Sequence, residues 1–117
     1  MDDSVAEHSR PLRILIADDS DSDRLILKTL LKRLGHEVLD VANGLDAVSV
    51  FQREAPDLVL LDALMPVMDG MEAARQIKLL AGERLVPLIF LTSLSEAGAL
   101  ARCLEAGGDD FLGKPYN

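Results

Sequence analysis

Aromatic residues and cysteine are scarce in this chain of 117 residues. It has three Phe, one Tyr and no Trp, so any core must be mainly aliphatic. Hydrophobic residues make up 49% of the chain, which is enough for one domain with a sizeable core. The one cysteine, Cys103, has no partner within the chain, so an internal disulfide framework is excluded and a reducing compartment is favoured. We expect Cys103 to be a small buried residue of a helix.

Basic residues and long apolar runs are also few. The chain has 12 Lys and Arg against 20 Asp and Glu, and its formal net charge of −8 argues against direct binding to nucleic acid. No apolar run approaches the roughly 20 residues of a membrane span. The N-terminus also lacks the basic-then-apolar pattern of a signal peptide. We therefore expect a cytoplasmic protein that does not insert into membranes, with residues 1–11 as a flexible tail.

Short apolar segments alternate with helical patterns along the rest of the chain. Strands are predicted at 13–17, 37–41, 58–61, 88–91 and 110–113, and helices at about 20–34, 45–53, 70–80 and 95–106, with a turn at Asn43-Gly44. Three of the strands show no polar alternation, which is typical of strands that are buried on both faces. The pattern predicts an α/β fold, a parallel sheet of five strands with helices on both faces.

Two details of this pattern concern the helices. In the first helix, apolar residues recur at the spacing of one helix face: Leu25, Ile26, Leu30, Leu31 and Leu34. A helix that should follow the fifth strand is absent before Asn117. We therefore expect a single domain over 12–117, truncated before its last helix and placed at the N-terminus of a longer protein.

Polar side chains stand where the predicted strands end. Asp18 and Asp19 follow the first strand, Asp62 ends the third, Thr92 the fourth, and Lys114 follows the fifth. In an open parallel sheet, ligands bind outside the carboxyl ends of the strands. Three carboxylates, a hydroxyl and an ammonium are therefore expected to converge at one edge.

This set of residues suits phosphoryl chemistry. Neighbouring carboxylates raise each other's pKa unless a cation is bound, and hard oxygen ligands suit Mg²⁺. Lys114 and Thr92 could hold phosphoryl oxygens, while a carboxylate such as Asp62 can form an aspartyl phosphate. Taken singly, Asp18 or Asp19 could be a helix cap, and Thr92 and Lys114 could be ordinary strand-end residues. An ionised Asp62 beside a buried strand, however, needs a partner.

Four motifs resemble those of the receiver domains of two-component response regulators, which have the flavodoxin-like fold. The motifs are ILIADDS at 14–20, LLDALMPVMDG at 60–70, FLTS at 90–93 and DDFLGKP at 109–115, and the resemblance covers 12–116. It implies the strand order 2-1-3-4-5. It also implies a phosphorelay in which a sensor histidine kinase or phosphotransfer protein donates a phosphoryl group to Asp62 with Mg²⁺ bound.

The resemblance also implies roles for single residues. Asp62 is expected to be the phosphoacceptor and Lys114 the phosphate-binding lysine. Asp19, Asp62 and the backbone carbonyl of Leu64 are expected to ligate Mg²⁺, with Asp18 acting through a bound water. Thr92 and Phe111 are expected to be the switch residues, with a plain core residue as the alternative for Phe111. The Lys114–Pro115 peptide bond is similar to one that is usually cis in receivers.

The expected output is a change in surface rather than the turnover of a substrate. The domain would catalyse only its own phosphorylation and dephosphorylation, so it is not expected to be an enzyme, although an effector domain beyond residue 117 could be one. The face of the fourth helix and fifth strand is the expected binding surface for an effector or for a second receiver in a homodimer. One alternative is an interaction or dimerisation module that works without phosphorylation. A more remote one is an aspartate-nucleophile phosphatase of the haloacid dehalogenase type.

Overall fold

The computed structural model describes residues 10–93 and 97–114. Its strands are β1 (Arg13–Ala17), β2 (Glu37–Val41), β3 (Leu58–Asp62), β4 (Leu88–Thr92) and β5 (Asp110–Gly113). Its helices are α2 (Asp21–Arg33), α3 (Gly44–Glu54), α4 (Gly70–Ala81) and α5 (Ala97–Glu105). The strands form one parallel sheet in the order β2-β1-β3-β4-β5, which confirms the predicted fold and strand order.

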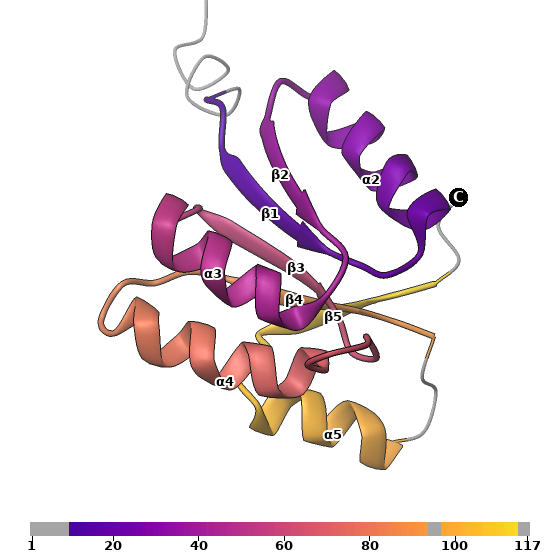
Figure 1. Cartoon of the computed structure of the whole chain (residues 1–117), viewed down its shortest axis with the longest axis vertical. Coiled ribbons are helices and arrows are strands. Elements are labelled where there is room, and N and C mark those ends of the chain that lie inside the picture. The colour runs from indigo at the N-terminus through magenta and orange to yellow at the C-terminus, as the bar shows by residue number, and fades with distance from the viewer. Residues whose placement is uncertain (1–9, 94–96, 115–117) are drawn as a thin grey trace, which may run out of the picture.

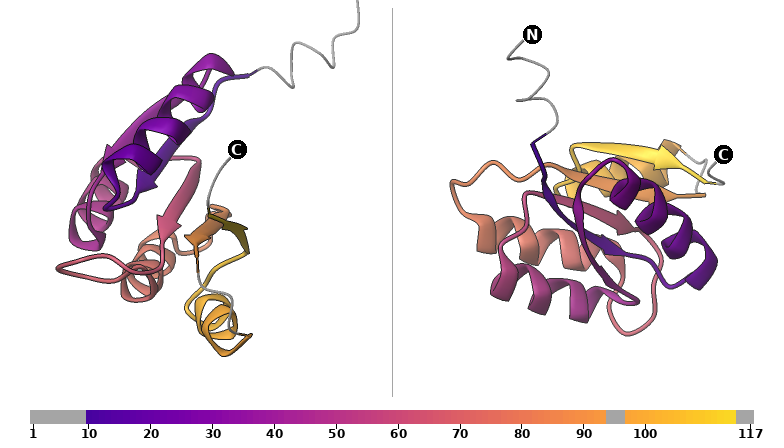
Figure 2. Two further views of the ribbon diagram at one scale, coloured as in Figure 1. Left: turned by 90° about the vertical axis from the view of Figure 1, so that its right-hand side faces the viewer. Right: turned by 90° about the horizontal axis from the view of Figure 1, so that it is seen from above.

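Helices cover both faces of this sheet. Figure 1 shows α3, α4 and α5 grouped on one side and α2 on the other, and the turned views in Figure 2 agree. Alternate residues of β1 point to opposite faces, so Leu15 packs in the larger core with α3, α4 and α5, whereas Ile14 packs in a smaller core with α2. Cys103 is fully buried in the larger core, as predicted.

The apolar stripe of α2 is covered less than its helical spacing suggests. Four of its members are exposed to 41% or more: Leu25, Ile26, Leu30 and Leu34. Leu27, which is not part of the stripe, is buried instead, and Leu31 packs partly against the smaller core. The reason is that α2 packs mainly on β1 and β2, and no other described helix lies on its side of the sheet. The edges of the stripe therefore have no described neighbour to cover them.

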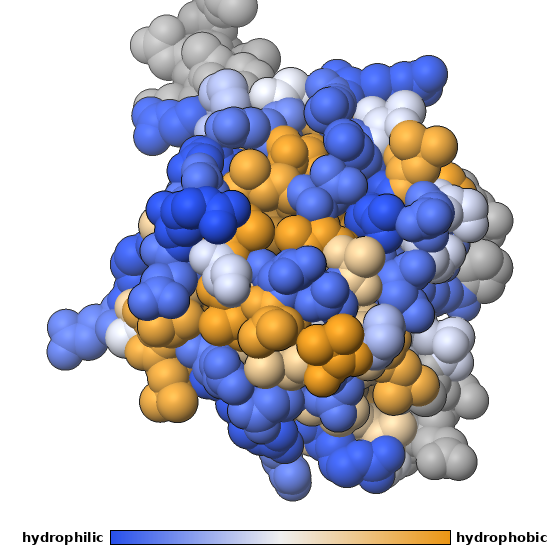
Figure 3. Space-filling model, viewed as in Figure 1, coloured by the Kyte–Doolittle hydropathy of each residue, from blue (hydrophilic) through white to orange (hydrophobic). Residues whose placement is uncertain are grey.

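Figure 3 shows hydrophobic residues gathered in the middle of the face that carries β2, α3 and α4, with hydrophilic residues around the rim. Within the described part of the chain, no helix is both long enough and apolar enough to cross a membrane.

Side-chain caps begin three of the helices. The Ser20, Asn43 and Asp69 side chains accept hydrogen bonds from backbone N–H groups inside the first turns of α2, α3 and α4. The turn predicted at Asn43-Gly44 leads directly into α3, which begins one residue earlier than predicted: Asn43 is its N-cap and Gly44 is its first residue. The Gly44 N–H donates to the carbonyl oxygen of Met68 at 3.1 Å, and a Cβ at Gly44 would collide with that carbonyl.

A second glycine sets the end of β3. The Gly70 N–H donates to the Ala63 carbonyl oxygen at 2.9 Å, and a Cβ at Gly70 would collide with the backbone carbonyl of Asp62. The amino end of α4 thus packs directly against the residue that ends β3. This close packing holds the loop between β3 and α4 against the sheet edge where the polar strand ends meet.

Candidate functional site

The parallel register aligns the strand ends that carry the predicted site residues. Ala17 pairs with Leu61, and Asp62 pairs with Leu91, so the residues that follow β1, β3 and β4 lie side by side. The Lys114 N–H donates to the Thr92 carbonyl oxygen at 2.9 Å, which continues the ladder past the end of β5. Four strand ends therefore meet at one edge of the sheet.

Three carboxylates gather at this edge. Asp18, Asp19 and Asp62 each place one carboxylate oxygen within 4.8 Å of the other two. Asp18 is fully buried and Asp62 nearly so, whereas Asp19 is exposed. Asp18 Oδ1 accepts from the Ser20 N–H at 2.9 Å, and the partner of Asp18 Oδ2 among the described residues is the Lys114 ammonium, in an ion pair at 3.0 Å. Two buried carboxylates next to an exposed one fit a hard cation that enters from solvent.

Lys114 supplies the positive charge of the site. Its Nζ lies 3.0 Å from Asp18 Oδ2, 3.1 Å from Asp62 Oδ2 and 3.2 Å from Asp23 Oδ2. Burial works against the ammonium charge, but hydrogen bonds to Asp18 and Asp62 outweigh it and raise the pKa of Lys114. Lys114 is therefore a cation throughout the physiological range. One cation cannot balance all the carboxylates around it.

The Asp62 carboxyl shows this imbalance. Burial raises its pKa to about 6; the Lys114 ammonium and the Leu64 N–H counter the rise, and the Asp18 charge adds to it. The Leu64 N–H donates to Asp62 Oδ1 at 3.4 Å. At neutral pH Asp62 is thus ionised in a setting that disfavours its charge, and a bound divalent cation would stabilise it.

The remaining predicted residues lie around this centre. Thr92 is buried at 3% exposure at the end of β4, next to the backbone of Lys114, and Phe111 in β5 is 37% exposed. The Leu64 side chain is 55% exposed beyond the end of β3. The predictions for the tail before Arg10 and for the Lys114–Pro115 peptide bond lie outside the described residues.

The contacts that two further residues make at the site were not predicted from the sequence. Asp23 adds a third carboxylate to Lys114, and Arg24 donates from Nη1 to the Asp18 carbonyl oxygen at 2.6 Å and from Nε to Asp40 at 3.2 Å. Both residues lie near the start of α2, after the Ser20 cap. Their partners are far along the chain or in the backbone, which sequence spacing does not reveal.

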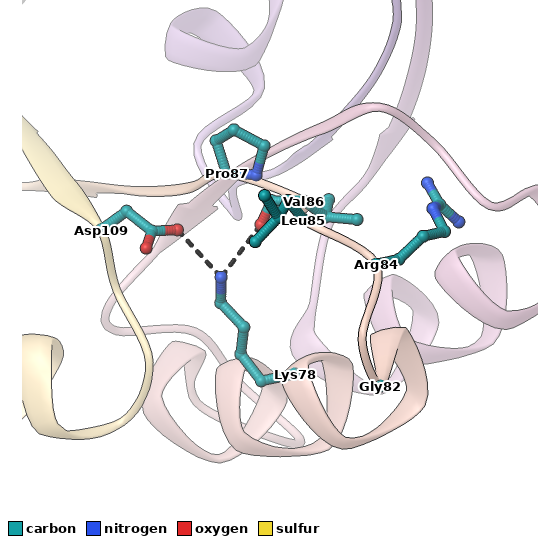
Figure 4. Close-up of a pocket in the computed structure, with 7 residues that line it drawn as sticks. All are labelled: Lys78, Gly82, Arg84, Leu85, Val86, Pro87 and Asp109. Atoms are coloured by element: carbon teal, nitrogen blue, oxygen red, sulfur yellow. Dashed lines mark hydrogen bonds and ion pairs between the residues drawn. The ribbon is translucent and has the colours of Figure 1, made fainter.

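A pocket lies at the opposite edge of the sheet. It is lined by Lys78, Gly82, Arg84, Leu85, Val86, Pro87 and Asp109, at the start of β4 and β5 (Figure 4). Lys78 Nζ donates to the Val86 carbonyl oxygen and to Asp109, both at 2.9 Å. These hydrogen bonds hold α4 against the sheet, and the pocket is separate from the acidic edge.

Known proteins resemble this chain in sequence and in fold. Residues 14–117 match the family model of the response regulator receiver domain. The chain is 41% identical over 105 residues to the probable transcriptional regulator ycf27 of Porphyridium aerugineum. The aligned region covers 90% of this chain and 42% of that protein. The chain therefore spans less than half the length of this curated relative.

Two solved structures extend the likeness to three dimensions. The receiver domain of sensor histidine kinase PA1611 from Pseudomonas aeruginosa PAO1, which has a magnesium ion coordinated in its active site cleft, superposes with a TM-score of 0.83 at 35% identity, covering 92% of this chain and 88% of that one. The chemotaxis protein CheY4 of Vibrio cholerae gives 0.86 at 28% identity over 92% and 90%. The flavodoxin-like strand order, the match over 14–117 and these relatives show that the chain belongs to the response regulator receiver domain family of two-component signal transduction.

Proposed function

We propose that this domain accepts a phosphoryl group on Asp62 from a sensor histidine kinase or phosphotransfer protein in the cytoplasm. The observation that carries the proposal is the ion cluster at the carboxyl edge, where Asp62 is buried beside Asp18 and Asp19 and pairs with Lys114 at 3.1 Å. In the transfer, an Asp62 carboxylate oxygen forms a bond to phosphorus as the bond from phosphorus to the donor's imidazole nitrogen breaks. The imidazole then takes a proton from solvent.

The residues at the carboxyl edge of the sheet would have different roles in the transfer. Asp19, Asp62 and the Leu64 carbonyl would hold Mg²⁺ directly and Asp18 would hold it through water; the ion, when bound, would neutralise charge on the transferring group. The Leu64 N–H donates to Asp62 Oδ1 and would orient this carboxylate for attack on phosphorus. Lys114, already charged and close to Asp62 Oδ2, would donate to a phosphoryl oxygen.

The output would be a change at the surface beside β4 and β5. The Thr92 hydroxyl would move toward the phosphoryl group, and Phe111, which is 37% exposed, would rotate into the space it leaves. The face of α5 and β5 would then bind an effector domain or a second receiver. The domain turns over no separate substrate, and its negative net charge of −8 argues against direct contact with nucleic acid.

Beryllofluoride, a phosphoryl mimic, tests the proposal. In ¹⁹F NMR with Mg²⁺, the wild-type chain should show bound fluoride resonances that need both Mg²⁺ and the Asp62 carboxylate, and Asp62→Asn should show none. A wild-type chain that does not bind beryllofluoride would favour an interaction module that works without phosphorylation. Turnover of an aryl phosphate would instead favour an aspartate-nucleophile phosphatase.

A further inference from the structure

Asp23 contributes a carboxylate to the site, but the proposed function gives this residue no role. It lies in the first turn of α2, where its backbone N–H donates to the Ser20 side chain at 3.3 Å. Its Oδ2 atom lies 3.2 Å from Lys114 Nζ, and the two side chains are 27% and 14% exposed. The cap fixes the turn, so the Asp23 carboxylate is held beside the ammonium.

Lys114 and a bound cation would compete for the same oxygens. The other two partners of Lys114 are Asp18 and Asp62, at 3.0 and 3.1 Å, and both belong to the carboxylate cluster that fits Mg²⁺. Like charges repel, so a cation in that cluster pushes the ammonium away from those two carboxylates. Asp23 lies outside the cluster and is the partner that Lys114 keeps.

We propose that Asp23 is a positioning residue that holds Lys114 beside the bound cation. Asp23 thereby competes with the phosphoryl group for the Lys114 ammonium. The inference rests on the proposed function of Asp62. Without the Asp23 charge, Lys114 depends wholly on Asp18 and Asp62, and the cation loses a nearby negative charge, so Mg²⁺ binds less tightly. A phosphoryl group, in contrast, loses both a competitor for Lys114 and a repelling carboxylate, so it binds more tightly.

Asp23→Asn therefore shifts the two affinities in opposite directions. By titration in ¹H–¹⁵N NMR, we expect its Mg²⁺ affinity without beryllofluoride to fall by about two- to fivefold, the range of a partly exposed ion pair. With saturating Mg²⁺, its affinity for beryllofluoride should rise by a similar factor. Asp23→Glu keeps the charge and should return both values toward those of the wild-type chain, which a loss of local folding would not explain.

The matched control is Asp21→Asn. Asp21 stands in the same helical turn and carries the same charge, but its side chain is 91% exposed and pairs with Arg24 rather than Lys114. Asp21→Asn should leave the affinities for Mg²⁺ and for beryllofluoride unchanged. Suppose that the wild-type chain binds both Mg²⁺ and beryllofluoride. The inference about Asp23 alone is then overturned if Asp23→Asn behaves like Asp21→Asn, or if it moves both affinities in the same direction. A wild-type chain that binds neither ligand overturns the proposed function as well.

Discussion

At the residue scale, one ammonium faces more carboxylates than it can neutralise. Lys114 lies within 3.2 Å of oxygens from Asp18, Asp23 and Asp62, and Asp18 is fully buried. Removing one partner from a buried ion cluster leaves charge that neither water nor protein compensates. The same excess of negative charge is what a divalent cation would relieve.

Lys114→Met should therefore destabilise the fold at pH 7 by about 2 to 3 kcal/mol without Mg²⁺, because it strands the buried Asp18 and Asp62 charges. Added Mg²⁺ should recover part of this loss by binding the folded state. Urea unfolding with and without Mg²⁺ measures both effects. Lys32→Met, at an exposed lysine of the last turn of α2, is the control and should cost less than about 0.5 kcal/mol. Equal effects of the two substitutions would refute the ion cluster.

Val67 is a second residue whose conformation has a measurable cost. Its φ is 70°, in the left-handed region that a β-branched residue avoids, and the Met68 N–H donates across it to the Pro66 carbonyl oxygen at 2.8 Å. Val67 is 77% exposed, so its side chain contributes little burial.

Val67→Asn should stabilise the domain by about 1 kcal/mol, since Asn tolerates this backbone conformation far better than Val. Thermal unfolding would show a higher Tm. The matched control is Leu85→Asn, at a residue that is 96% exposed and not among those with positive φ, where a change within about 0.5 kcal/mol is expected. A Val67→Asn variant that is less stable than the wild type would contradict this account of the loop.

At the element scale, local signals predicted most of the fold. Apolar runs marked β1, β3 and β4, and Ser20 marked the start of α2. The polar strand ends also placed Asp18, Asp62 and Lys114 at one edge, because a parallel sheet brings the carboxyl ends of its strands together.

Long-range contacts explain what local signals missed. Asn43-Gly44 has the composition of a turn, yet Asn43 caps α3, and Gly44, which packs against the Met68 carbonyl, is the first residue of that helix. The spacing of the α2 stripe indicates an apolar face but not which elements pack on it, and so it could not predict that Leu25 and Leu34 would be exposed. The contact between Asp23 and Lys114 joins residues from opposite ends of the chain.

The junction of α4, β4 and β5 depends on one carboxylate. Asp109 accepts from the Lys78 ammonium at 2.9 Å and from the Leu88 N–H at 2.8 Å. Partial burial acts to raise the pKa of Asp109, but these two hydrogen bonds outweigh it and hold the pKa below its usual value. A lowered pKa in the folded state means that the stabilisation is complete above the ordinary carboxyl pKa of about 4 and is lost as the pH falls through the lowered value.

Asp109→Asn should thus cost about 1 kcal/mol in the free energy of unfolding at pH 7, a modest value because the Asp109 side chain is 53% exposed. The difference from the wild-type chain should shrink as the pH is lowered toward about 3, below the ordinary carboxyl pKa. Urea unfolding at several pH values measures it. The control is Glu83→Gln, at an exposed acid of the preceding loop, which should cost less than about 0.5 kcal/mol at pH 7. A cost that stays constant with pH would mean that the Asp109 charge is not the cause.

At the scale of the whole molecule, the two edges of the sheet differ in chemistry. At the amino edge, carboxylates lie close to basic side chains, as in Glu54 with Arg13 at 2.6 Å and Asp109 with Lys78 at 2.9 Å. At the carboxyl edge, three clustered carboxylates and Asp23 surround Lys114. The ion pairs of the amino edge stabilise the fold, whereas the carboxyl edge keeps an excess of negative charge. That excess would bind a cation, and the cation and Lys114 would together bind a phosphoryl group.

The most direct test is to locate the phosphoryl group. The wild-type chain would be incubated with a phosphorylated histidine phosphotransfer protein and Mg²⁺, reduced with borohydride, which converts an acyl phosphate to an alcohol, and mapped by mass spectrometry. The account predicts homoserine at position 62 and none in Asp62→Asn or without Mg²⁺. An unmodified Asp62 in a folded wild-type chain, or modification at Asp18 or Asp19 instead, would contradict it.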